Sequence, residues 1–81
     1  MNRGGKRPPA YVQIREYVRS QIAQGRWKTN GRLPTEAELA DQFGISRFPV
    51  KKALAGLAEE GVIYRIQGKG TFVAEPEAAS A

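Results

Sequence analysis

Hydrophobic residues recur at helical spacing near the start of the chain. Successive members of this set are three or four positions apart: Tyr11, Ile14, Val18 and Ile22. That interval puts side chains on one face of an α-helix. Gly25 follows, at the position where helices commonly end in a left-handed residue. The pattern predicts an amphipathic helix over residues 11–24.

Two further helices are predicted by their capping residues and glycine stops. Thr35-Glu36-Ala37-Glu38 has the form of a capping box, and the short helix after it carries Leu39 and Phe43 as a buried pair before Gly44. Ser46 is a second N-cap, so another helix begins at Arg47 and runs to about Glu60, before Gly61. Pro49 falls in its first turn, where a missing N–H costs little. Two short helices joined by Gly44-Ile45-Ser46 are typical of a helix-turn-helix.

The end of the chain predicts a β-hairpin. Residues 62–66 and 71–74 are rich in β-branched and aromatic side chains, and Gln67-Gly68-Lys69-Gly70 separates them. Either Ile63 or Val62 is expected to pack under the helices, and the alternation does not decide which. Upstream, Asn30-Gly31 predicts a turn, and Arg32-Leu33 a very short strand ended by Pro34. The predicted fold class is therefore mainly α with a small β-hairpin.

The predicted helix over residues 47–60 has two different faces. At about 100° per residue, four apolar residues share one arc: Val50, Ala53, Leu54 and Leu57. A separate arc holds cations and no acid: Arg47, Phe48, Lys51, Lys52 and Ala55. Glu59 and Glu60 are confined to the last turn, so the first turn is positive and the macrodipole reinforces it. A solvated face usually mixes signs, so we favour a phosphate-facing surface over a merely solvated one.

Composition narrows the possible functions. The chain has 81 residues, 13 Lys and Arg against 8 Asp and Glu, and neither Cys nor His. This length suits one small domain. Without Cys or His, thiolate and imidazole metal sites, thiol nucleophiles and the commonest general base are excluded. We therefore expect no metal, no cofactor and no enzyme activity. The basic excess suggests an anionic polymer partner, with simple solubility as the alternative.

The chain divides into three parts by composition. Residues 1–10 are rich in Gly, Pro and charge, which predicts a flexible basic arm. Residues 11–74 form the compact unit, and the acidic residues 75–81 read as a tail or the start of a linker. No stretch is long and apolar enough to span a membrane, and the first residues lack the apolar region of a secretory signal. We expect a cytoplasmic protein.

A set of motifs, in order and correctly spaced, resembles the N-terminal winged helix-turn-helix domain of GntR-type bacterial transcription regulators. The motifs are Tyr11-Val12-Gln13-Ile14, Gly31-Arg32-Leu33-Pro34-Thr35-Glu36, Glu38-Leu39-Ala40, Phe43-Gly44-Ile45-Ser46-Arg47, Val50, Ala53-Leu54, Leu57, Glu60-Gly61 and Gln67-Gly68-Lys69-Gly70-Thr71-Phe72-Val73. The resemblance covers about residues 11–74. The closing Gly-Lys-Gly-Thr-Phe-Val is most similar to the HutC-like subfamily.

The resemblance implies sequence-specific binding to double-stranded DNA for transcription regulation, as a repressor. The helix over 47–60 would lie in the major groove of a palindromic operator, and the wing over 67–70 in the minor groove. Arg47 corresponds to the base-reading arginine of the family, which donates to guanine. Lys51 stands where the family usually has Arg, and would contact a base or a phosphate. Gly68 and Lys69 match the wing tip.

Other candidate contacts set the position of the domain rather than the sequence it reads. Thr35, Tyr11 and Lys52 are candidates for phosphate contacts, with core packing as the alternative for Tyr11. Arg65 adds a cation on the first hairpin strand. Arg3, Lys6 and Arg7 of the arm either enter a minor groove or only raise non-specific attraction.

Two departures from the family pattern remove polar contacts. Phe48-Pro49 stands where the family often has two small polar residues, and Ala37 where it often has Arg. Phe48 cannot donate to a base edge, although it can touch a thymine methyl group. The operator sequence of relatives is therefore not transferred to this chain.

The resemblance also has implications for partners. GntR-type regulators act as dimers on DNA, whereas we expect this domain alone to be monomeric in solution. A small-molecule effector would bind only through a further domain C-terminal to the tail. The alternative function is a winged-helix protein-interaction module, in which the basic face and exposed Phe48 meet an acidic protein.

Overall fold

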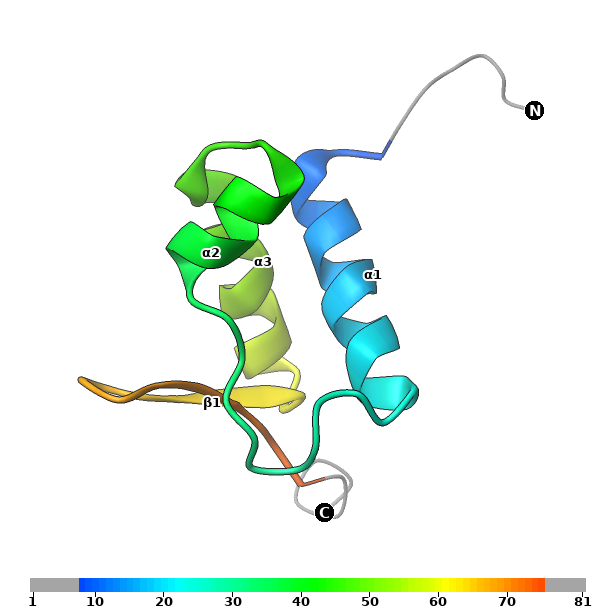
Figure 1. The fold of residues 1–81 in the computed structure, drawn as a ribbon, viewed down its shortest axis with the longest axis vertical. Coiled ribbons are helices and arrows are strands. Elements are labelled where there is room, and N and C mark those ends of the chain that lie inside the picture. Colours follow the sequence, from blue (N-terminus) through cyan, green and yellow to red (C-terminus); the bar gives the residue numbers. More distant parts are fainter. Residues whose placement is uncertain (1–7, 76–81) are drawn as a thin grey trace.

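A computed structural model describes residues 8–75, and residues 1–7 and 76–81 lie outside that part. The predicted arm cations Arg3, Lys6 and Arg7 therefore lie outside the described residues. The elements follow in the order α1 (Ala10–Ala23), α2 (Glu36–Phe43), α3 (Arg47–Glu59), β1 (Ile63–Ile66) and β2 (Gly70–Val73). In Figure 1, α1 runs beside α3, α2 lies against α3, and the hairpin projects past the helices. No helix in residues 8–75 is long and apolar enough to cross a membrane.

The periodic segment near the start forms α1 as predicted. Ile14 and Val18 are fully buried, while Tyr11 and Ile22 pack against the core from its edge. Gly25 follows the helix with φ +75°, the left-handed conformation that ends many helices. The helix begins one residue earlier than the periodicity indicates, because the carbonyl of Pro9 accepts from the N–H groups of Val12 and Gln13.

The predicted capping box at the start of α2 is confirmed. The N–H of Glu38 donates to Thr35 Oγ1 at 3.0 Å, and the N–H of Thr35 donates to Glu38 Oε1 at 2.8 Å. Gly44 ends the helix with φ +66°. Leu39 is fully buried, but Phe43 is only half-buried. The ring of Phe43 packs edge-on against Tyr17 of α1 with the ring centroids 5.2 Å apart, at the rim of the core.

Helix α3 begins after Ser46, as predicted, but the Ser46 side chain makes no capping hydrogen bond. A cap side chain accepts from the second or third helical N–H, and the third residue here is Pro49, which has none. The apolar arc of α3 is buried in full: Val50, Ala53, Leu54 and Leu57. This helix contacts α1, α2 and β1, so it is the centre of the core.

The hairpin pairs β1 with β2 antiparallel, with Ile63 opposite Val73 and Ile66 opposite Gly70. Gly70 therefore belongs to the strand, and the connecting loop is shorter than the four residues expected from the sequence. Ile63 is 2% exposed and joins the core, whereas Val62 is half-buried. Of the two residues that the sequence left open, Ile63 is therefore the one that packs under the helices.

The irregular segment before α2 runs along the free edge of β2. Arg32 forms a bridge to Phe72, and the N–H of Leu33 donates to the carbonyl of Thr71 at 2.8 Å. The carbonyl of Gly31 accepts from the N–H of Val73 at 3.0 Å. The predicted short strand at Arg32-Leu33 is confirmed as a single bridge. This bridge holds the segment that leads into α2 against the hairpin.

Candidate nucleic-acid interface

The exposed arc of α3 carries the cations predicted from the sequence. Arg47, Phe48, Lys51 and Lys52 are all exposed on the side opposite the buried residues. The first turn of α3 holds no acidic residue. Because a helix N-terminus carries a positive partial charge, Arg47 adds to an end that already attracts anions.

A groove of about 640 Å³ lies between this end of α3, the entry to α2 and the hairpin. Its walls comprise Arg32, Leu33, Pro34, Thr35, Glu36, Ala37, Arg47 and residues 65–71. Five of the predicted site residues therefore line one groove although they are distant in sequence: Thr35, Arg47, Arg65, Gly68 and Lys69. The groove places cations from three elements around one concave surface.

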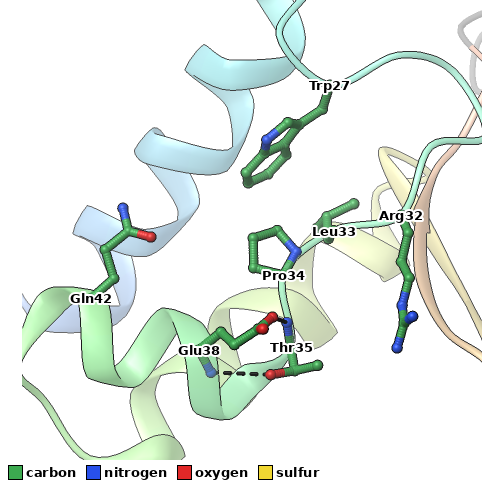
Figure 2. A pocket seen from close by; sticks show the side chains of 7 residues that line it. All are labelled: Trp27, Arg32, Leu33, Pro34, Thr35, Glu38 and Gln42. Atoms are coloured by element: carbon green, nitrogen blue, oxygen red, sulfur yellow. Dashed lines mark hydrogen bonds between the residues drawn. The ribbon is translucent and has the colours of Figure 1, made fainter.

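Thr35 serves α2 and remains available to a ligand. Its hydroxyl oxygen accepts from the Glu38 N–H, as Figure 2 shows. A hydroxyl has one hydrogen to donate and two lone pairs to accept with, so this bond leaves its hydrogen free. Thr35 is exposed at the groove. The capping role and a phosphate contact are compatible.

Arg65 is held towards α2 by an ion pair. Its Nη2 lies 3.0 Å from Glu36 Oε2, and the Arg65 side chain is 54% exposed. This contact links the hairpin to the first residue of α2. A pair this exposed contributes little to stability, but it orients the guanidinium within the groove.

The tip of the hairpin has a conformation that requires glycine. Gly68 has φ +80°, and a side chain added there would meet nothing within 4 Å. The constraint is therefore backbone strain, not lack of space. Lys69 is exposed beside it, and its N–H donates to the carbonyl of Ile66 at 2.9 Å. The tip presents a cation on a narrow backbone turn.

Tyr11 and Lys52 lie apart from this groove. The Lys52 ammonium sits over the Tyr11 ring, 4.1 Å from its centroid, and both line a hollow with Arg15, Glu59 and Glu60. Lys51 lines another hollow, between α3 and the hairpin, together with Arg65 and Thr71. Phe48 lines none of these three surfaces. The predicted residues other than Phe48 therefore line three separate surfaces: the groove, the hollow at Tyr11 and Lys52, and the hollow at Lys51.

Arg32 also lines the groove, although the sequence interpretation did not include it among the candidate site residues. It is exposed, it lines the groove, and a Cβ placed on Gly70 would come within 2.9 Å of its Nε. The Arg32 side chain thus lies against Gly70, and Figure 2 shows it beside the hairpin. The sequence did offer one indication, because Arg32 is a basic residue just before Pro34 and the capping residue Thr35. Its orientation depends on pairing with β2, which is a long-range contact.

Comparison with known proteins gives one family. The family described as "Bacterial regulatory proteins, gntR family" matches residues 10–73. The histidine utilization repressor of Klebsiella aerogenes is 45% identical over 73 residues, which cover 90% of this chain and 30% of that protein. The repressor NagR of Bacillus subtilis is 48% identical over 69 residues, covering 85% of this chain and 28% of the relative. The chain thus spans less than a third of the length of these curated relatives.

Solved structures agree in fold. The AraR DNA-binding domain in complex with operator ORR3 is 43% identical, with a TM-score of 0.82 over 85% of this chain and 83% of that one. A GntR family transcriptional regulator from Listeria monocytogenes is 28% identical, with a TM-score of 0.83 over 89% of this chain and 63% of that one. Both comparisons assign the three helices and hairpin to the winged helix-turn-helix class.

Proposed function

Because the chain belongs to the gntR family of bacterial regulatory proteins, we propose that it binds operator DNA sequence-specifically and serves transcriptional repression. Its relatives are transcriptional regulators and not enzymes. The observation that carries the proposal is the groove in which Thr35, Arg47, Arg65 and Lys69 meet. The AraR DNA-binding domain, which has the same fold, was solved in complex with operator ORR3.

In the proposed complex α3 occupies the major groove of the duplex. Arg47, at the first helical position, donates to O6 and N7 of a guanine, a bidentate contact that other bases do not offer. Lys51 is exposed one turn further along and contacts a base edge or a nearby phosphate. The wing over residues 67–70 enters the adjacent minor groove, where the narrow turn at Gly68 brings Lys69 close to the backbone.

The remaining cations and hydroxyls position the domain on the phosphate backbone. Thr35 donates its free hydroxyl hydrogen, and Arg32 and Arg65 supply charge from the walls of the same groove. Tyr11 and Lys52 contact phosphates on the far flank of α3. Such contacts fix register and orientation and carry no sequence information directly.

The regulator acts as a dimer on a palindromic operator, since two copies of one DNA-binding domain match two half-sites related by symmetry. This domain alone is monomeric in solution. A small-molecule effector binds only through a further domain, and the protein works in the cytoplasm. The curated relatives are more than three times as long as the segment that matches this chain, so they have room for a further domain.

Selection of bound duplexes from a random pool tests the proposal. The expected outcome is a palindromic site with fixed half-site spacing, bound with an affinity that falls steeply as salt rises. Equal affinity for all duplexes at moderate salt would contradict sequence-specific binding. A duplex titration that leaves the chemical shifts of residues 47–52 unchanged would favour the second candidate, a protein-interaction module. The 71% exposure of Phe48 on a cationic face is the observation that supports this candidate.

A further inference from the structure

Phe48 is the most exposed large hydrophobic residue in residues 8–75. Its side chain is 71% exposed, against 41% for Ile66. The other aromatic side chains of this part each have a ring or a cation as partner: Tyr17 with Trp27 and Phe43, Tyr64 with Phe72, and Tyr11 with Lys52. Phe48 has no such partner among the described residues. Packing within the domain therefore does not account for this ring.

The position of Phe48 points to what covers it. It follows Arg47 in the first turn of α3, and Lys51 and Lys52 lie three and four residues later on the same side of the helix. In helix-turn-helix proteins, the N-terminal residues of the second helix contact base edges. An apolar ring amid cations suits a duplex, in which the phosphates take the charges and the bases meet the ring.

The chemistry of the ring restricts what it can read. Phe48 neither donates nor accepts a hydrogen bond, and the C5-methyl group of thymine is the apolar feature of the major-groove edge. Cytosine lacks that methyl group, and 5-methylcytosine has it at the same place. A ring at this position therefore distinguishes pyrimidines by their C5 substituent.

We propose that Phe48 is a specificity-determining residue that packs on the C5-methyl group of a pyrimidine beside the base pair read by Arg47. The domain then prefers thymine to uracil, and 5-methylcytosine to cytosine, at one position of each half-site. This inference rests on the proposed operator binding and deepens it. It makes binding sensitive to cytosine methylation at that position.

Replacing thymine by uracil, one position at a time, in the selected operator isolates the methyl group. The 81-residue chain is titrated with each duplex. At one position per half-site, uracil weakens binding about fourfold, the factor that burial of one methyl-sized group gives. With Phe48→Ala the thymine and uracil duplexes bind equally at that position. A duplex with 5-methylcytosine at that position binds the original chain about fourfold more tightly than a duplex with cytosine there. Phe48→Ala binds these two duplexes equally.

Ile66→Ala is the comparison variant, because Ile66 is the other exposed large hydrophobic residue. Ile66 lines the groove, so the ratio of thymine to uracil affinity is compared and not the overall affinity. This variant keeps the preference for thymine over uracil. Circular dichroism of Phe48→Ala matches that of the original chain, since the removed side chain is largely exposed.

The two proposals fail in different ways. A chain that binds its operator specifically but ignores uracil at every position overturns the role of Phe48 and leaves operator binding intact. A thymine preference that survives in Phe48→Ala overturns it as well. Failure to select any specific site contradicts operator binding and this inference together.

Discussion

Arg47 combines exposure, position and charge in one residue. It occupies the first helical position of α3, no acid shares that turn, and its side chain reaches the groove. Arg32 lines the same groove but sits on an extended segment beside the hairpin. A helix in a major groove reaches base edges, whereas an extended segment at its side meets the phosphate backbone. We therefore expect Arg47 to contact a base edge and Arg32 to contact a phosphate.

Arg47→Ala is expected to cost about 1–3 kcal/mol of binding free energy and to relax the preference at one base pair per half-site. The reason is loss of the bidentate contact to guanine. Titration against single-base-pair variants of the selected operator measures both effects. Arg26→Ala is the control, because Arg26 is also exposed but lines none of the interface surfaces. An equal loss on every sequence would show that Arg47 contacts phosphate only.

Arg32→Ala is expected to weaken binding uniformly across sequences. A phosphate contact releases a counterion, so the slope of log affinity against log salt falls by about 1. Binding titrations at several salt concentrations measure the slope. Arg32→Lys keeps the charge and should keep the slope. A change in sequence preference without a change in slope would assign Arg32 to a base edge instead.

At the start of α2, the residue that caps the helix also lines the candidate interface. An eight-residue helix is too short to be stable alone, so its cap and its buried residues Leu39 and Ala40 hold it in place. The same cap residue, Thr35, faces the groove. One side chain, that of Thr35, therefore both caps α2 and lines the groove.

Thr35→Ala is expected to lower the free energy of unfolding by about 1 kcal/mol, because the N–H of Glu38 loses its acceptor. Urea unfolding followed by circular dichroism measures the change. Thr35→Ser keeps the hydroxyl and should keep the stability. Glu38→Ala removes the other half of the capping box without touching the groove. If only Thr35→Ala also weakens DNA binding, Thr35 contacts the duplex.

At the scale of the whole molecule, α3 joins the core to the interface. One face packs on α1, α2 and β1, and the opposite face carries the exposed cations. Glu60, just after this helix, accepts hydrogen bonds from Arg15 and Arg19 of α1. The orientation of the cations therefore depends on the packing of the entire domain.

Leu57→Ala is expected to lower the free energy of unfolding by about 2–5 kcal/mol, because Leu57 is fully buried and its loss leaves a cavity. A domain of this size has little stability to spare, so much of the variant is unfolded. Thermal unfolding with and without operator DNA measures this. Bound DNA should restore part of the stability, since it favours the folded state. An unchanged melting temperature would place Leu57 outside the core.

By itself, the sequence determined what short-range interactions control. The helix ends at Gly25 and Gly44, the capping box at Thr35 and the two faces of α3 all follow from residues within a few positions of one another. Such features depend on local hydrogen bonds and side-chain periodicity, which are readable along the chain. The prediction that Ser46 precedes a helix beginning at Arg47 is confirmed, although the Ser46 side chain makes no capping hydrogen bond.

Only the tertiary structure decided which distant residues meet. It buried Ile63 rather than Val62, placed Arg32 against Gly70, and paired Arg65 with Glu36. Each outcome depends on how the hairpin docks on the helices, and that docking is set by packing between segments 29 to 38 residues apart in the last two cases. The sequence therefore determined the bounds and the two faces of α3, whereas the groove beside it exists only because the core brings three separate segments together.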